Sequence, residues 1–316
     1  MQTRLLSPDD QGIDEACALL AAGEVVAIPT ETVYGLAGDA RNPEAVARIY
    51  AAKGRPSFNP LIVHVADQDM AERFAVFDSE ALVLTDAFWP GALTLVLPLR
   101  PDAGIASLVT AGLDTVAIRM PAHPVAHRLL VAFGGPLAAP SANPSGRITA
   151  TTAAHVADPA NGLGGRIPAV LDAGACPVGV ESTIVGWSGG RPALLRPGGI
   201  PAEAIEAALG QRLMRPSHDP DAPSAPGQLL SHYAPRASLR LNATGAETGE
   251  VMIGFGKVSG DLTLSAGGDM VEAAARLFEV LHQADAMERP IAIAPVPETG
   301  LGAAINDRLR RAAAPR

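Results

Sequence analysis

Lys53 to Val65 reads KGRPSFNPLIVHV, and it joins the end of a predicted helix to a buried strand. Two cations separated by one residue, Lys53 and Arg55, begin the stretch, and its apolar end contains one histidine, His64. A cationic loop at such a junction can hold an anion, because the strand fixes the position of its polar groups. Of 24 basic residues only Lys53 and Lys257 are lysine, so a compact ammonium here is unusual for this chain. The alternative is a solvated lysine at a helix C-terminus.

Outward from this stretch, the first two thirds of the chain alternate between helical and strand patterns. One helix is well defined, because Asn42 is a suitable N-cap, Pro43 suits the first helical position and Gly54 is a fitting C-terminal stop. The other helices are expected at 13–22, 67–88, 124–133 and 201–209. Strands are expected at 25–29, 61–65, 93–98, 115–121, 169–174, 182–187 and 193–198, with a short one starting at 137. Residues 29–40, PTETVYGLAGDA, are polar and predict a turn-like segment.

The composition changes at Arg215, where a proline-rich segment predicts a linker that ends in HYAP. Beyond it, strands are expected near 250–256, 262–267 and 290–297, and helices near 269–287 and 301–313. This order favours a small three-layer α/β domain with a parallel sheet. The predicted organisation is a first domain at 1–212, a linker at 213–236 and a C-terminal α/β domain at 237–316.

The bulk composition excludes several classes of protein. The chain has 316 residues, 48% hydrophobic and 18% charged, which is typical of folded domains and not of disordered chains. Its net charge is −9, and residues 1–210 contribute 13 basic and 21 acidic groups, a balance of −8. Non-specific nucleic-acid affinity rests on neutralised phosphates, so we expect no strong direct nucleic-acid binding. Two cysteines without metal-ligand spacing, no signal region and no long apolar run predict a cytosolic protein without a membrane segment.

Polar side chains gather at the predicted strand ends, where ligands bind in open α/β sheets. The cations Lys53, Arg55, Arg119 and Arg196, with hydroxyls and amides between them, would suit a triphosphate and a carboxylate. Each has a structural alternative. His64 could be a core histidine, Arg119 a buried ion-pair partner, and Ser141 and Asn143 ordinary turn residues. It is their joint occurrence that favours a site.

Seven consecutive segments carry a resemblance to a known family. They are PTETVYGL, KGRPSFNPLIVHV, WPGALTLVL, VAIRMP, PSANPSG, ESTIV and LLRPGGI. In this order they resemble the motifs of the YrdC-like family. The linker segment PGQLLSHYAP and the following domain resemble its two-domain branch, the threonylcarbamoyl-AMP synthases. The resemblance implies a twisted open α/β sheet with a large concave cavity, followed by a linker and a small Rossmann-like domain.

The resemblance also implies an activity, that of a nucleotidyltransferase joining L-threonine, bicarbonate and ATP into threonylcarbamoyl-adenylate with release of pyrophosphate. A separate transferase complex would use the adenylate to modify an adenosine beside the tRNA anticodon. Mg²⁺ is implied by the triphosphate, and no carboxylate cluster in the sequence predicts a protein-built metal site. Catalytic roles fall on Lys53 and Arg55, which would neutralise bicarbonate and the phosphates.

Matching the motifs position by position implies two sets of binding residues. The ATP set is Arg55, Asn59, Thr115, Ser141, Asn143, Thr149, Arg196 and, from the linker, Tyr233. The threonine set is Thr32, His64, Arg119, Ala139 through its backbone, and Ser182. Thr115 and Thr149 lie outside the tightest motif cores. A mobile segment placing Tyr233 over the cavity would shield the adenylate from water, as catalytic lids do.

Two other functions fit parts of these observations. The same fold serves carbamoyl transfer in hydrogenase maturation, but those proteins carry zinc-finger modules that two isolated cysteines exclude. A concave face could also grip double-stranded RNA, although a balance of −8 in residues 1–210 argues against the broad basic surface this requires.

Overall fold

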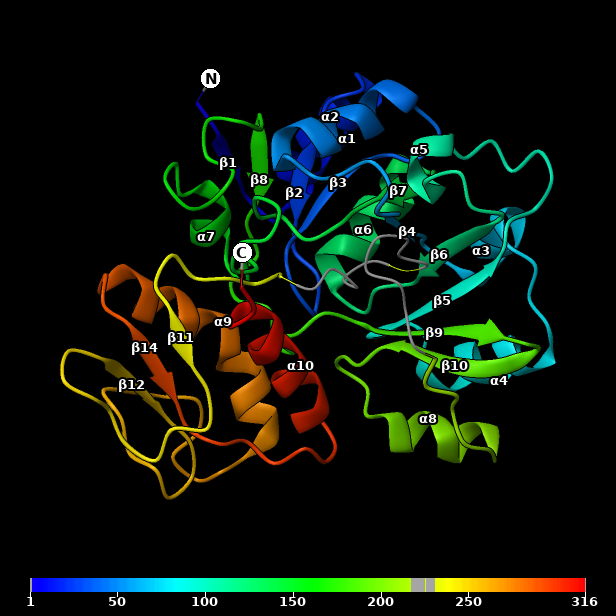
Figure 1. Ribbon diagram of the computed structural model, residues 1–316. Coiled ribbons are helices and arrows are strands. Elements are labelled where there is room, and N and C mark those ends of the chain that lie inside the picture. Colours follow the sequence, from blue (N-terminus) through cyan, green and yellow to red (C-terminus); the bar gives the residue numbers. More distant parts are fainter. Residues whose placement is uncertain (1, 217–224, 226–230, 316) are drawn as a thin grey trace.

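The computed structural model describes residues 2–216, 225 and 231–315. Figure 1 shows a larger unit built on one twisted sheet and a smaller, C-terminal unit beside it. Most of the predicted linker lies outside the described residues, apart from its first residues, Ala225, and the segment from Ser231 onward.

A ten-stranded mixed sheet forms the larger unit. Its strands are β1 (Arg4–Leu6), β2 (Val26–Ile28), β3 (Gly35–Asp39), β4 (Ile62–His64), β5 (Leu93–Pro98), β6 (Thr115–Arg119), β7 (Leu137–Ala138), β8 (Ala169–Leu171), β9 (Thr183–Ser188) and β10 (Arg191–Arg196). They lie in the order β1-β8-β2-β3-β7-β4-β6-β5-β9-β10. Parallel pairing of β4 with β6 sets His64 directly beside Arg119, and parallel pairing of β5 with β9 sets Leu93 beside Thr183. The polar ends of these strands therefore lie at the same edge, as the sequence pattern predicts.

Strand β3 corrects one expectation. Residues 29–40 look like a turn, yet Gly35–Asp39 pairs antiparallel with both β2 and β7. The segment GLAGD lacks the β-branched residues that favour strands, so only its tertiary contacts show that it is one. Its glycines permit close packing: a Cβ at Gly38 would lie 3.2 Å from the Ile49 side chain.

Helices cover the faces of this sheet. They are α1 (Asp10–Ala21), α2 (Pro43–Lys53), α3 (Gln68–Phe74), α4 (Ser79–Phe88), α5 (Ser107–Thr110), α6 (Pro124–Phe133), α7 (Ala153–Ala157) and α8 (Ala202–Leu209). The predicted ends of α2 are confirmed, because Asn42 accepts hydrogen bonds from Glu44 and Ala45 and Gly54 is left-handed. The helical stretch 67–88 is two helices, since Asp78 caps a second start. Short elements without a clear periodic pattern (β1, α5, α7) were not expected.

The smaller unit contains the expected parallel sheet. Its strands are β11 (Leu239–Arg240), β12 (Val251–Gly254), β13 (Leu262–Thr263) and β14 (Ile291–Ile293), and its helices are α9 (Met270–Ala286) and α10 (Gly302–Ala312). The strand order is β11-β14-β12-β13, with every pair parallel. Figure 1 shows α9 and α10 on the side of this unit that faces the large sheet.

The two units share a hydrophobic cluster. Val33, Ile148 and Val180 of the larger unit pack in one buried group with Phe278 and Leu281 of α9. Gly179, at φ 74°, lies so near α9 that an added Cβ would come within 2.4 Å of the Ala274 carbonyl oxygen. The smaller unit is therefore packed tightly onto the loop that precedes β9.

Candidate active site

A cavity with about 550 Å³ of empty space, part of it open to solvent, lies at the polar ends of the large sheet. Its wall is formed by Thr30, Thr32, Val33, Gly35, Arg55, Ile62, His64, Arg119, Ala139, Pro140, Ser141, Glu181, Ser182, Arg196, His232 and Tyr233. These residues come from strands β3, β4, β6 and β10, from loops next to β2, β7 and β9, and from the C-terminal end of the predicted linker. The cavity therefore combines parts of the chain that are more than 200 residues apart.

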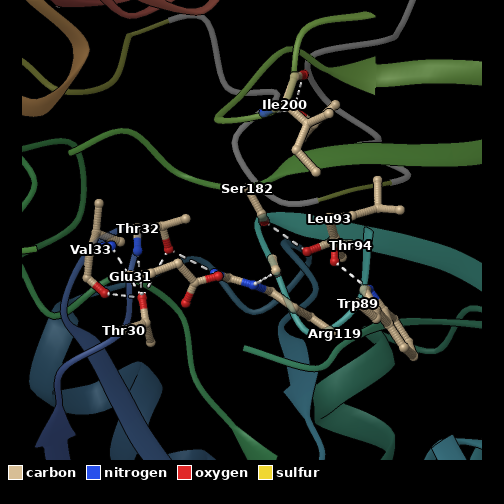
Figure 2. Close-up of polar contacts among 12 residues, drawn as sticks. Thr30, Glu31, Thr32, Val33, Trp89, Leu93, Thr94, Arg119, Ser182 and Ile200 are labelled. Atoms are coloured by element: carbon tan, nitrogen blue, oxygen red, sulfur yellow. Dashed lines mark hydrogen bonds and ion pairs between the residues drawn. The ribbon is translucent and has the colours of Figure 1, made fainter. Parts of the chain in front are cut away.

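Arg119, at the end of β6, is held by three different groups (Figure 2). Its Nε donates to the Gly91 carbonyl at 3.0 Å, Nη1 to the Thr32 hydroxyl at 2.9 Å, and Nη2 to Glu31 Oε1 at 2.5 Å. A guanidinium has five N–H donors, so one N–H on each terminal nitrogen is left over. Arg119 is thus an ion-pair partner on the cavity wall that still has two N–H groups available to a carboxylate.

The electrostatics of this corner keep the glutamate charged and the histidine neutral. Burial alone would raise the pKa of Glu31, but the adjacent Arg119 lowers it overall. Burial and the charge of Arg119 together lower the pKa of His64 to about 3. His64 therefore faces the cavity as a neutral imidazole that exchanges hydrogen bonds.

Ser182 joins this corner to the next strand end. Its hydroxyl lies 2.7 Å from the hydroxyl of Thr94 on β5, as Figure 2 shows. Arg196, at the end of β10, donates from Nη2 to the Ser182 carbonyl at 2.8 Å and to its hydroxyl at 3.2 Å. The start of the ESTIV segment, at Ser182, is therefore held by hydrogen bonds to β5 and β10, the strands on either side of β9.

Two guanidinium groups line the same stretch of wall. Arg55 donates to the carbonyls of Asn59 and Pro60, at 3.2 Å and 2.9 Å. Burial and the neighbouring charge of Arg196 lower the pKa of Arg55 to about 10, and burial lowers that of Arg196 to about 10. Both remain cationic at neutral pH, and two like charges on one buried wall favour an anionic ligand.

Lys53 is not part of the cavity wall. Its ammonium is buried and donates to the carbonyls of Ser141 and Asn143, at 2.5 Å and 2.6 Å. Burial lowers the pKa of Lys53 well below its ordinary value. The ammonium therefore fixes the turn that places Ser141 on the wall, and one of its three N–H donors is left over.

Five side chains on or next to the cavity wall have a buried polar atom without a hydrogen-bond partner among the described residues. The atoms are both amide atoms of Asn59, Oδ1 of Asn143, Oε2 of Glu31, Nδ1 of His232 and Nη2 of Arg308. Leaving such a group unpaired costs about 1–3 kcal/mol, so groups of this kind are rare and often mark functional sites. Here they cluster at one cavity.

Glu181 is a cavity residue that the sequence analysis missed. Its Oε1 accepts from the Thr149 hydroxyl at 3.0 Å, and Oε2 accepts from Arg308 Nε of α10 at 3.0 Å. Burial would raise its pKa, but the charges of Arg308 and Arg196 lower it, so Glu181 is ionised. Its place directly before Ser182 in the ESTIV motif was the one available signal.

Tyr233, near the end of the predicted linker, forms part of the cavity wall. It is buried, its backbone φ is 63°, and its ring stacks on Phe278 at 5.5 Å between centroids. The adjacent His232 contacts it edge to face at 4.0 Å, and burial lowers the pKa of His232 to about 3. A left-handed backbone is uncommon for a residue with a side chain and points to a fixed placement of this ring.

The structure brings most of the predicted site residues together. On the wall are Thr32, Arg55, His64, Arg119, Ala139, Ser141, Ser182, Arg196 and Tyr233. Lys53, Asn59, Asn143, Thr115 and Thr149 are not among the wall residues. Ala139 uses its backbone N–H in a bond to the Ile62 carbonyl. The sequence analysis did not select Thr30, Glu181 or His232, although all three lie on the wall.

Thr115 lies furthest from the polar edge. It begins β6, and Arg119 ends it, so about 13 Å of strand separates them at roughly 3.3 Å per residue. Because side chains alternate along a strand, Thr115, Ala117 and Arg119 share one face. Ala117 packs on this face with Ile62 and Ile184, which form an apolar floor next to the cavity.

Neither a metal cluster nor a membrane span is present in the part of the chain that the structure describes. No group of three or more His, Cys, Asp or Glu side chains there could hold a metal ion. Both oxygens of Glu181, the carboxylate on the wall, already accept hydrogen bonds. No helix among these residues is both long and apolar enough to cross a membrane.

Comparisons with known proteins fit this geometry. Residues 18–198 match the Sua5/YciO/YrdC family model, described as "Telomere recombination", and residues 200–314 match the model described as "Threonylcarbamoyl-AMP synthase, C-terminal domain". A threonylcarbamoyl-AMP synthase from Bacillus subtilis is 44% identical over 98% of this chain and 94% of its own length. One from Pyrococcus abyssi is 40% identical over 94% of this chain and 92% of its own.

A solved structure extends the similarity to three dimensions. The crystal structure of P. abyssi Sua5 complexed with L-threonine superposes with a TM-score of 0.90 at 37% identity, covering 99% of this chain and 98% of that one. The expected family and the open-sheet fold with a second, smaller unit are confirmed. The chain belongs to the Sua5/YciO/YrdC family and, with its C-terminal domain, to the threonylcarbamoyl-AMP synthases.

Proposed function

We propose that this enzyme joins L-threonine, bicarbonate and ATP into L-threonylcarbamoyladenylate and releases pyrophosphate. The adenylate serves the threonylcarbamoyl modification of the adenosine next to the anticodon in tRNA. The observation that carries the proposal is one cavity with a free guanidinium edge on Arg119 and two further cations, Arg55 and Arg196, on its wall. The relatives named for this activity, similar over nearly the whole chain, support it.

The corner around Arg119 suits L-threonine. The two left-over N–H groups of Arg119 can bind the carboxylate side by side, a geometry that adds specificity as well as energy. Neutral His64 and Thr32 are close enough to that corner to bind the substrate hydroxyl or carboxylate. Ser182, fixed by Thr94 and Arg196, completes the pocket on its other side.

The wall around Arg55 and Arg196 suits the triphosphate. Ser141 adds a hydroxyl, and Asn59 and Asn143 have amide atoms without partners behind it. Lys53 contributes by holding the Ser141 turn and by its one remaining N–H. The apolar floor of Ile62, Ala117 and Ile184, which Ala225 also contacts, would carry the nucleoside toward Thr115.

The chemistry needs positioning more than covalent help from the protein. The neutral amine of threonine attacks the bicarbonate carbon, and loss of water gives a carbamate. A carbamate oxygen then attacks the α-phosphorus of ATP, and the bond to the bridging oxygen breaks as pyrophosphate leaves. Charge builds up on the phosphoryl oxygens, where the guanidinium groups of Arg55 and Arg196 stabilise it.

Mg²⁺ would enter with ATP and neutralise part of the phosphate charge. The wall around Arg55 and Arg196 carries cations and hydroxyls, and both oxygens of its carboxylate, Glu181, already accept hydrogen bonds, which fits a metal bound mainly by phosphate oxygens and water. A separate transferase complex would then take the adenylate to tRNA. The buried ring of Tyr233 fits a cover that keeps water from the adenylate until that transfer.

The decisive experiment measures pyrophosphate release with threonine, bicarbonate or ATP left out in turn. We expect release only when all three are present, with threonylcarbamoyl-AMP identified by mass spectrometry. Release that continues without threonine would disprove the proposal. Measuring the affinity for tRNA at several salt concentrations distinguishes this enzyme from an RNA-binding protein. For an RNA-binding protein, the logarithm of the association constant would fall steeply with the logarithm of the salt concentration.

A further inference from the structure

Arg308 of α10 is the largest fully buried side chain of the protein among the described residues, yet it lies outside the cavity wall. Its Nε donates to Glu181 at 3.0 Å, and Nη1 donates to the Pro197 carbonyl and to Asp307. Its guanidinium also stands over the Tyr233 ring, 5.5 Å from the centroid. One side chain of the smaller unit therefore contacts three segments that build the cavity.

The smaller unit approaches these segments at a second point. Gly179 lies against the backbone of α9, and the next residues reach Glu181 and Ser182 on the wall. The Val178 N–H donates to the Glu31 carbonyl at 2.8 Å, which links this loop to the Arg119 corner. The Gly199 N–H donates to the Glu181 carbonyl at 3.0 Å and ties the loop to the end of β10. The loop before β9 is thus clamped between the two units.

The negative charge of Glu181 is unfavourable for binding an anion in the cavity. Glu181 is an ionised carboxylate on the wall of a cavity whose ligand carries several negative charges. Without a cation behind it, this carboxylate would repel the phosphates and would be costly to bury. Arg308 supplies the cation: burial alone would lower its pKa, but Tyr233, Glu181 and Asp307 raise it, so its charge is permanent.

We propose that Arg308 is a positioning residue for the nucleotide end of the site, neutralising Glu181 and fixing Tyr233 from the C-terminal unit. Glu181 then turns its oxygens to Thr149 and Arg308 and away from the phosphates. The C-terminal unit is on this view a structural part of the ATP site, not an appendage. The inference rests on the proposed function, since it assigns the anion to ATP.

The test is a charge-suppression experiment on the full chain. Arg308→Met is expected to raise the KM for ATP about tenfold or more, because it leaves Glu181 uncompensated, while the KM for threonine changes about twofold at most. Adding Glu181→Gln to that variant is expected to bring the KM for ATP back to within about threefold of wild type. A residue that merely stabilises the fold would alter both substrates together and would show no such suppression.

The control is Arg310→Met on the same helix. Arg310 is 56% exposed and pairs only with the exposed Glu298 among the described residues, so its loss should leave both KM values unchanged. If Arg308→Met does not fold, the KM values for ATP and threonine are compared instead in Arg308→Gln and in the double variant Arg308→Gln/Glu181→Gln. The proposal is overturned if folded Arg308→Met or Arg308→Gln keeps the wild-type KM for ATP, or if Glu181→Gln restores nothing. Wild-type protein that shows no threonine-dependent pyrophosphate release would instead refute the proposed function.

Discussion

Two buried arginine–glutamate pairs flank the same cavity, and they differ in how the chain brings them together. Arg119 and Glu31 both belong to the large sheet and its loops, 88 residues apart. Arg308 and Glu181 belong to different units, 127 residues apart. The Arg119–Glu31 pair forms within the large sheet and its loops, whereas the Arg308–Glu181 pair forms only when the C-terminal unit is docked.

Burial does not explain the difference between the pairs. The side chains of Arg119 and Glu31 are 4% and 11% exposed, and those of Arg308 and Glu181 are 0% and 8% exposed. Both arginines are buried, but Arg119 lies on the cavity wall and Arg308 lies outside it. The proposed roles, recognition for Arg119 and support for Arg308, follow from this difference in position.

The largest expected effect comes from breaking the recognition pair. Arg119→Met should reduce kcat/KM for threonine by about a thousandfold or more, because it removes the carboxylate partner. It should also cost about 3–5 kcal/mol of unfolding free energy by leaving Glu31 buried and unpaired. Pyrophosphate release and urea unfolding measure the two effects. Arg128→Met, at an exposed pair on α6, is the control, and a threonine response surviving in Arg119→Met would show that the carboxylate binds elsewhere.

Neutralising each glutamate in turn sharpens the comparison. Glu31→Gln weakens the hold on Arg119 by about 1.5–3 kcal/mol, the worth of a charged hydrogen bond, and should raise the KM for threonine by about tenfold to a hundredfold. Glu181→Gln should leave the KM for threonine within about twofold of wild type. Steady-state kinetics with each substrate varied give both numbers. If both variants changed the KM for threonine equally, the two arginine–glutamate pairs would not have different roles.

Tyr233→Ala tests the cover over the nucleotide wall. Removing the buried ring opens the cavity to water, so the share of AMP among the products should rise about threefold or more while threonine dependence persists. Chromatographic separation of AMP and the adenylate measures this ratio. Tyr233→Phe, which keeps the ring and its stacking on Phe278, is the matched control and should behave like wild type. An unchanged product ratio in Tyr233→Ala would exclude the cover.

Acid should weaken both pairs. The pKa values of Glu31 and Glu181 are lowered in the folded state from their ordinary value of 4.5. Their contribution to stability is therefore complete above pH 4.5 and is lost as the pH falls through the lower, folded-state values. Urea unfolding between pH 6 and pH 3 should show a steeper loss for wild type than for the double variant Glu31→Gln/Glu181→Gln. Parallel curves would mean that the pairs do not titrate in this range.

The smallest effect belongs to an exposed pair. Arg276 and Glu272, one turn apart on α9, are 42% and 45% exposed. Arg276→Ala should change the unfolding free energy by less than about 0.5 kcal/mol and leave the kinetics alone. A larger change would show that α9 contributes to the interface through its outer face as well.

The sequence predicted the large sheet, the caps of α2 and most of the cavity wall because these features depend on local patterns and motifs. Strand β3 was not predicted, because GLAGD becomes a strand only through its pairing with the strands on both sides. Glu31 and Glu181 were not predicted as site residues, because their role depends on which arginine packs against them. The spacing of α10 places Arg308 on the face of Ile305 and Ala312, but the sequence does not show which group its charge pairs with, because Glu181 is 127 residues away. Contacts between distant segments are what a single sequence hides.

The scarcity of lysine has a practical consequence. Lys53 is buried under two carbonyls, and Lys257, the other lysine, is exposed on the C-terminal unit. Of the two lysines, an amine-selective dye used near neutral pH is therefore expected to label Lys257. A reporter there, on the C-terminal unit, would follow the docking of that unit without any cysteine engineering.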